Sequence, residues 1–134
     1  MLKAKAVIVL TVFVWPEYIH ESGLSNKSSI TQSGQGAQAS IAQSGSINDA
    51  AITQEIGSSN NDATILQTGS SNIGSIDQSG ISNIAEISQN GLSNSAEIVQ
   101  SGNSNYANVS QAGTFKLAQL TQTGNSNSAI ITQH

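Results

Sequence analysis

The chain of 134 residues contains no cysteine and no arginine, a single proline and five aromatic residues. Without cysteine there can be no disulfide, no thiolate metal ligand and no cysteine nucleophile. Charged residues make up 9% of the chain, against about 25% in an ordinary soluble domain, and the formal net charge is −4. An acidic chain with so few cations lacks the basic face of a nucleic-acid-binding protein, so we expect no nucleic-acid partner.

Uncharged polar residues are what the chain has in abundance. Serine, asparagine, glutamine and glycine account for 61 of the 134 residues. Such a composition by itself is typical of a disordered polar tract, because few large apolar groups are available to offset the conformational entropy of the chain. The order of these residues nevertheless predicts a regular fold.

Residues 1–25 differ in composition from the rest of the chain. Lys3 and Lys5 flank the start of a ten-residue, mainly apolar run at 6–15. A membrane-spanning helix needs about 20 residues, whereas a run of this length is typical of a secretory signal peptide. We predict that residues 1–25 are a signal peptide and a short N-terminal segment, with cleavage between 16 and 25. The alternative is a buried strand or helix of the mature fold.

From residue 26 to the end at 134 the chain repeats an eleven-residue unit, N-x-A-x-I-x-Q-x-G-x-x. Its glutamines are spaced by 11 residues, with one interval of 13: Gln32, Gln43, Gln54, Gln67, Gln78, Gln89, Gln100, Gln111, Gln122 and Gln133. An aliphatic residue stands two positions before each glutamine: Ile30, Ile41, Ile52, Ile65, Ile76, Ile87, Ile98, Val109, Leu120 and Ile131. A small residue stands two positions before each aliphatic one: Ser28, Ala39, Ala50, Ala63, Gly74, Ala85, Ala96, Ala107, Ala118 and Ala129.

Asparagine and glycine complete the unit. Asparagine stands two positions before the small residue, except at Ala37 and Lys116: Asn26, Asn48, Asn61, Asn72, Asn83, Asn94, Asn105 and Asn127. Glycine follows the glutamine by two positions in eight repeats: Gly34, Gly45, Gly69, Gly80, Gly91, Gly102, Gly113 and Gly124. A repeat of this density over more than 100 residues is a strong signal of a stacked architecture.

The spacing of two within each unit is the period of a β-strand. It places the asparagine, the small residue, the aliphatic residue and the glutamine on one face of a seven-residue strand. Four residues then reverse the chain, with a glycine of positive φ in the turn. We therefore predict an all-β, two-sheet parallel β-solenoid of the cross-β type, with ten strands in five 22-residue coils. The two extra residues fall in the turn 55–60, which absorbs them without shifting the register.

The inward faces of this solenoid predict its core and its polar ladders. The aliphatic and small residues meet between the two sheets, where each buried isoleucine contributes about 1.5–3 kcal/mol. A buried amide without a partner costs about 1–3 kcal/mol. We therefore expect the inward asparagines and glutamines to form ladders, in which each carbonyl accepts from the amide NH₂ of the coil below.

Other functions are less well supported by the residues. The only histidines, His20 and His134, lie near the two ends, and the acids at 49, 62, 77, 86 and 97 occupy outward positions, so we expect no enzyme, no cofactor, no small-molecule substrate and no metal site. A solenoid that binds ice would need a regular outward threonine array, whereas these threonines are irregular: Thr31, Thr53, Thr64, Thr121 and Thr132. Outward apolar residues either contact a neighbouring filament or surface, or are scattered surface hydrophobes: Ile73, Ile84, Val99, Tyr106, Phe115, Leu117 and Ile130.

The repeat resembles the curlin-associated repeat of curli fibre subunits, whose pattern runs S-x5-Q-x-G-x-x-N-x-A-x3-Q. Residues 82–100 carry it in register, with these matches: Gln89, Gly91, Asn94, Ala96 and Gln100. The resemblance covers residues 26–133 and includes the five-coil count. It implies a protein exported unfolded through an outer-membrane pore, which polymerises outside the bacterial cell into functional amyloid for adhesion and biofilm, together with a second curlin-repeat subunit.

Two departures leave the kind of subunit open. Residues 16–25 do not resemble the glycine-rich export segment of the major subunit, and Lys116 breaks the asparagine column, as is more frequent in the minor, nucleating subunit. We expect a secreted structural subunit of a curli-type fimbrium or pilus on the cell surface, major or minor. The alternative is a monomeric solenoid that binds ice or a glycan surface.

The last repeat predicts how such a subunit assembles. It keeps the full inward set of Asn127, Ala129, Ile131 and Gln133, and the chain has no polar capping repeat after it. Bare strand edges template further pairing. Stacking the last coil on the first coil of the next subunit makes a heterologous contact that does not close, and so gives a filament.

Overall fold

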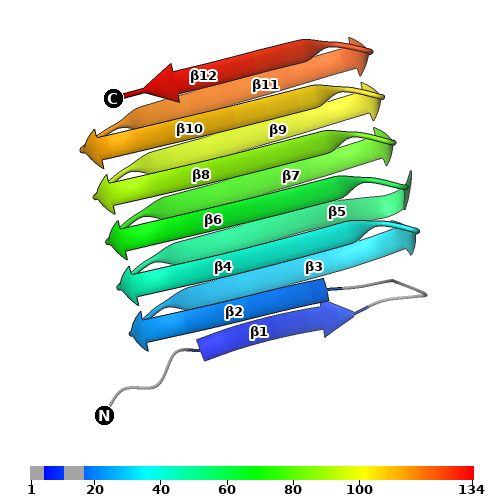
Figure 1. The fold of residues 1–134 in the computed structure, drawn as a ribbon. Helices are drawn as coiled ribbons and strands as arrows, with labels where there is room; N and C mark the ends of the chain where they lie inside the picture. The colour runs from blue at the N-terminus through cyan, green and yellow to red at the C-terminus, as the bar shows by residue number, and fades with distance from the viewer. Residues whose placement is uncertain (1–4, 11–16) are drawn as a thin grey trace.

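Two parallel β-sheets face each other in the computed structural model, which describes residues 5–10 and 17–134 (Figure 1). The first sheet contains, in spatial order, β1 (Lys5–Leu10), β3 (Lys27–Gln35), β5 (Asp49–Ser59), β7 (Ile73–Ile81), β9 (Ser95–Asn103) and β11 (Leu117–Asn125). The second contains β2 (Glu17–Leu24), β4 (Gln38–Ser46), β6 (Asp62–Ser70), β8 (Ile84–Leu92), β10 (Tyr106–Thr114) and β12 (Ser128–Gln133). The chain alternates between the sheets, so each pair of consecutive strands makes one coil.

Every strand pairs in parallel with the strand two places along the chain. In β8 and β10, for example, Ile87 lies beside Val109 and Gln89 beside Gln111, which are 22 residues apart. Equivalent repeat positions therefore form columns along the axis of the stack. The predicted fold class, a two-sheet parallel β-solenoid with a 22-residue coil, is confirmed.

The number of strands differs from the prediction, because residues 5–10 and 17–134 form twelve strands rather than ten. The two additional strands come from the N-terminal segment: β1 pairs with β3, and β2 pairs with β4. The register of β2 on β4 places Ile19 beside Ile41 and Gly23 beside Gly45. Cleavage of a signal peptide between residues 16 and 25 stays a prediction, and residues 1–4 and 11–16 of this segment lie outside the described part.

The core is a narrow column of aliphatic and small side chains between the sheets. Ile30, Ile41, Ile52, Ile65, Ile76, Ile87, Ile98 and Val109 are at most 1% exposed. The alanine column lies beside them, and Ile131 in the last strand is partly buried against the same cluster. Since every coil adds one such pair of apolar rungs, each coil is stabilised mainly by its two neighbours, as in other repeat proteins.

The strands are longer and the turns tighter than the sequence pattern predicts. A typical strand begins one residue after the asparagine and continues three residues past the glutamine, so it has nine residues rather than seven. The connection is reduced to two residues, such as Ser82 and Asn83 between β7 and β8. The strand continues through the glycine because the glycines of neighbouring coils pair in register, as Gly91 does with Gly113.

The residue before the asparagine position, which the sequence analysis left unassigned, reverses the chain. It has a positive φ between 55° and 60° in nine turns, where it is most often serine: Ser25, Ile47, Asn60, Ser71, Ser82, Ser93, Ser104, Phe115 and Ser126. The glycines after the glutamines also have positive φ, with one exception at Gly34. Gly34 differs because it lies beside Ser58 in the bulge of β5.

That bulge accommodates the two extra residues of the 13-residue interval. The pairing of β5 with β7 is regular up to Gln54 beside Gln78 and resumes at Ser59 beside Ile81. The prediction that residues 55–60 absorb the insertion without a register shift in the ladder is therefore confirmed, although they do so inside an eleven-residue strand rather than in a loop.

Candidate functional site

The glutamines of successive coils are joined by direct side-chain hydrogen bonds. Gln89 Nε2 donates to Gln111 Oε1 at 2.9 Å and Gln67 Nε2 donates to Gln89 Oε1 at 2.8 Å. The equivalent bonds, from Gln32 to Gln133, measure 2.7 to 2.9 Å. Each bond runs from the NH₂ of one coil to the carbonyl of the next coil toward the C-terminus, so both ladders have a fixed direction.

The same glutamines also bridge the two sheets, which the repeat pattern alone did not indicate. The second N–H of Gln89 Nε2 donates to the backbone carbonyl of Ile73, at the start of the facing strand of the same coil, at 2.9 Å. Gln100 bonds Ile84 O in the same way at 3.0 Å. A buried glutamine thus uses both amide hydrogens and its carbonyl, and it ties each coil to the next and one sheet to the other.

The asparagines form the expected amide ladder at some rungs, where Asn72 Nδ2 donates to Asn48 Oδ1 and Asn105 Nδ2 donates to Asn83 Oδ1, each at 3.1 Å and in the direction opposite to the glutamines. They also bond the backbone. Asn72 Oδ1 accepts from the backbone N–H of Asn94 at 3.1 Å, while its Nδ2 donates to the carbonyls of Thr68 and Gly91, each at 3.1 Å. The side chain therefore satisfies backbone groups of the tight turn, because a two-residue turn leaves its own amides and carbonyls unpaired. At Lys116, which interrupts the column, the backbone N–H still donates to Asn94 Oδ1 at 3.0 Å.

At the N-terminal end of the second sheet the glutamine ladder stops at Gln43, because the residue paired with it in β2 is not a glutamine. Gln43 is 1% exposed, and its Oε1 is a buried atom with no hydrogen-bond partner in the described part of the chain. The residue one coil below it, in the position of the repeated glutamine, is Glu21. A carboxylate donates no hydrogen bond, and Glu21 instead accepts one from the hydroxyl of Ser28.

At the opposite end, β11 and β12 form the last rungs of the two sheets. Gln133 Oε1 accepts from Gln111 at 2.8 Å, and Gln133 Nε2 donates to Leu117 O at 3.0 Å. Asn127, Ala129, Ile131 and Gln133 are more exposed than their equivalents in inner coils, because no further coil covers them within the described residues. The C-terminal end of the stack therefore presents the amide donor of Gln133, and the glutamine ladder at the N-terminal end stops at the carbonyl acceptor of Gln43.

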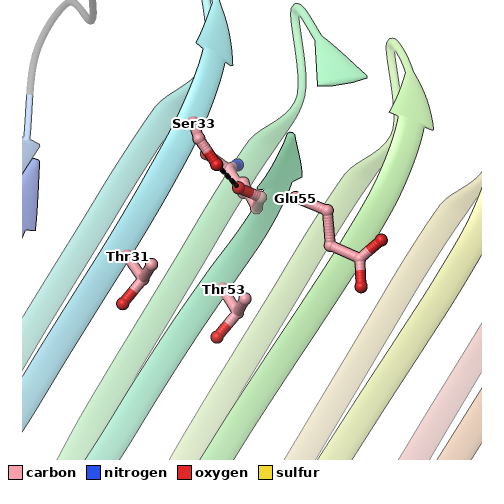
Figure 2. A pocket seen from close by; sticks show the side chains of 5 residues that line it. Thr31, Ser33, Thr53 and Glu55 are labelled. Atoms are coloured by element: carbon pink, nitrogen blue, oxygen red, sulfur yellow. Dashed lines mark hydrogen bonds between the residues drawn. The ribbon is translucent and has the colours of Figure 1, made fainter. Parts of the chain in front are cut away.

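The outward faces carry the charged residues. Asp62, Glu86 and Glu97 are exposed, whereas Asp49 and Asp77 are half-buried. In the described part of the chain, no three histidine, aspartate or glutamate side chains gather as a metal site would require. A hollow on the outer face of β3 and β5 is lined by Thr31, Ser33, Thr53, Gln54 and Glu55, and Figure 2 shows Thr31 and Thr53 side by side on neighbouring strands.

The threonine rows are short, as the sequence suggested. Thr31 pairs with Thr53, but the next two positions in this column are Asp77 and Val99. A carboxylate and an isopropyl group interrupt the hydroxyl array, so the face does not offer the regular surface that ice binding needs. Among the described residues there is also no helix long and apolar enough to span a bilayer.

One outward acid makes the stability of the stack depend on pH. Burial raises the pKa of Asp77 above its ordinary value of 3.8, and the nearby Glu55 carboxylate raises it further. The folded chain therefore holds this proton more tightly than the unfolded chain does. The stabilising contribution is fully present below about pH 3.8 and is lost as the pH rises through the raised pKa.

We expect Asp77→Asn to increase stability at neutral pH and to flatten the stability profile between mildly acidic and neutral pH. The exposed Glu97→Gln is the control. Denaturant midpoints of assembled protein across this pH range provide the measurement. If the stability of Asp77→Asn falls with rising pH as steeply as that of the wild type, the raised pKa of Asp77 does not cause the pH dependence.

Together these features define a class of protein: a parallel β-solenoid whose buried amides run as ladders along the stacking axis. Two overlapping stretches, residues 58–91 and 82–113, match the curlin associated repeat family. This match confirms the resemblance inferred from the sequence over residues 58–113, within the longer range of 26–133 for which it was predicted. No curated protein matches the chain.

Proposed function

We propose that the protein is a secreted structural subunit that stacks end to end into an extracellular curli-type amyloid fibre for adhesion and biofilm. The curlin associated repeats support fibre formation as the general role. The observation that carries the proposal is the complementarity of the two ladder ends. A neighbour's Gln133 has an amide donor to offer, and Gln43 has a buried carbonyl that lacks one.

End-to-end stacking places the last coil of one subunit, β11 and β12, on β3 and β4 of the next. In the single chain β1 and β2 occupy that place. The register of β2 puts Glu21 where a neighbour's Gln133 would lie. Since Glu21 cannot donate to Gln43 and glutamine can, the neighbour's coil completes the ladder better than β2 does. Cleavage between residues 16 and 25 during secretion removes β1 and so opens this edge on the first sheet, and a cleavage close to residue 25 removes β2 as well.

The stacking contact does not close on itself, so it generates a filament rather than a ring. Both sheets continue across the contact with the same parallel pairing, and each added subunit presents a fresh edge to the next. Further partners follow from the family resemblance: an outer-membrane export pore and a second curlin-repeat chain. A major subunit and a minor, nucleating subunit share this architecture, and the abundance of the chain in native fibres distinguishes them.

The test is fibre growth by the mature chain and by two matched variants. We expect the wild-type chain to be disordered when freshly diluted and to become β-rich fibres after a lag, with a spacing of about 4.8 Å along the fibre. Seeds should shorten the lag. Gln133→Glu replaces the terminal donor with an acceptor that faces Gln43 Oε1, so we expect elongation on wild-type seeds to slow at least severalfold, for a cost of about 1–3 kcal/mol.

Thr132→Glu is the control, because it adds the same charge one residue away on the exposed outward face. Seeded elongation, followed by thioflavin fluorescence and filament length, measures both variants. Equal slowing in the two variants would contradict the ladder contact. A wild-type chain that stays a folded monomer for days at micromolar concentration would contradict the fibre function itself.

A further inference from the structure

One long edge of the stack is apolar. It consists of the turns that lead from the second sheet back to the first, which lie at the left in Figure 1. Each of the five turns presents at least one exposed large apolar side chain there. We call these six residues the apolar edge: Leu24, Ile47, Ile73, Leu92, Phe115 and Leu117.

The turns of this edge are stacked directly on one another. The backbone N–H of Ile47 donates to Leu24 O at 3.0 Å, and the backbone N–H of Phe115 donates to Leu92 O at 3.0 Å. The six side chains lie in three adjacent columns, with Leu24 and Leu92 in one, Ile47 and Phe115 in the next and Ile73 and Leu117 in the third. Polar residues occupy the other positions of these columns, but each turn contributes an apolar side chain, so the three columns together form a stripe along the stacking axis. The opposite edge is polar in the described residues, apart from Ile81 and Ile84 in one turn and the half-buried Tyr106.

Two residues of the apolar edge occupy a conformation that suits them poorly. Ile47 has φ 60° and Phe115 has φ 56°. This left-handed region is unfavourable for a β-branched or bulky residue, and an isolated outlier of this kind points to a functional requirement. The equivalent position in most other turns is serine, for example Ser71 and Ser93. The fold does not need a large apolar side chain at these two positions, because serine serves the same turn elsewhere.

The charges of the molecule favour a second copy of the chain at this edge rather than on a sheet face. The outer faces carry acidic side chains on both sheets: Glu55, Asp77, Glu86 and Glu97. Two copies that met face to face would oppose like charges. At the apolar edge, Lys27 and Asp49 form an ion pair at 3.2 Å, and Lys116 adds a further positive charge, so no block of acids opposes contact.

We propose that the apolar edge is a lateral interface through which two stacks of this chain pair along their length, a proposal that rests on the proposed fibre function. In a two-fold symmetric contact the apolar edge of one copy meets the same edge of the other. Its six side chains present several hundred Å² of surface, about the size at which an apolar patch marks an interaction site. Since each added subunit extends the stripe, the buried area soon exceeds the roughly 800 Å² per partner of a standard interface.

The experiment compares fibres of the mature chain, which keeps at least the five residues of the apolar edge that follow position 25, with fibres of two double variants. Ile47→Ser with Phe115→Ser removes apolar surface from the edge and installs the residue that other turns use. Ile81→Ser with Ile84→Ser removes two exposed isoleucines from the opposite edge as the matched control. We expect mass per length, measured by electron microscopy of unstained fibres, to fall about twofold in the first variant and to remain unchanged in the second. Elongation of the first variant should be at least as fast as that of the wild type.

Several outcomes would overturn the pairing. These are wild-type fibres that are single stacks, an edge variant that remains paired, or an equal loss of pairing in the control. Single wild-type stacks that bind alkyl-coated beads, with binding lost in the edge variant, would assign the stripe to surface adhesion instead. A wild-type chain that forms no fibres would overturn the proposed function and the pairing together, which separates that failure from all the others.

Discussion

We expect Gly91→Val to be the most damaging single substitution in the repeats. A Cβ built on Gly91 lies 1.9 Å from the carbonyl oxygen of Gly113 in the next coil, and Gly91 has φ 133°, which L side chains rarely adopt. Backbone of the neighbouring coil cannot move away without breaking the pairing of β8 with β10. The expected loss is about 3 kcal/mol or more, the sum of backbone strain and a steric clash, and fibre formation should slow at least tenfold.

Gly57→Val is the matched control, because Gly57 also has a positive φ, of 85°, but its added Cβ meets nothing within 4 Å. It therefore carries the conformational penalty without the clash. Assembly kinetics and denaturant midpoints of the fibres measure both variants. If the two substitutions have equal effects, the close approach of the coils does not limit the choice of residue at position 91.

The second large effect concerns Gln89 in a middle coil. Gln89→Ala removes one rung and leaves buried groups without their partners, among them Gln111 Oε1 and Ile73 O. Each such group costs about 1–3 kcal/mol, and the truncation adds a cavity. We expect fibre stability to fall by roughly 3–5 kcal/mol, with a longer lag before assembly.

Two further variants separate hydrogen bonding from packing at this position. Gln89→Glu keeps the volume but removes both donors, so we expect it to be nearly as damaging at neutral pH. Gln119→Ala removes an exposed outward glutamine, whose partner is Glu97 on the surface, and should change stability by less than about 0.5 kcal/mol. Hydrogen exchange and denaturation midpoints provide the measurement. Equal effects at positions 89 and 119 would contradict the contribution of the buried ladder.

The repeat pattern was sufficient to predict the architecture of this chain. A period of two places Ile87 and Gln89 on the same side of a strand, and a repeat of 22 residues per coil brings each of them beside its equivalent in the next coil. Burial of isoleucine and the cost of an unpaired amide then leave few arrangements other than stacked coils with ladders. These are local and periodic constraints, which is why the order of the residues could express them.

Only the tertiary structure shows where the glutamine ladders end, which bonds join the two sheets and which turn residue takes a positive φ. The bridge from Gln89 to Ile73 O depends on the separation of the two sheets, which no repeat spacing encodes. The left-handed conformation of the residue before each asparagine position results from the closure of a two-residue turn. The residue type there varies, for example serine at Ser71 and phenylalanine at Phe115. The pairing of β2 with β4, and with it the unpartnered carbonyl of Gln43, depends on contacts with a segment, β2, that lacks the repeat motif. Periodicity determines which residues face inward, whereas the ends, edges and cross-sheet contacts depend on distances that exist only once the coils are stacked.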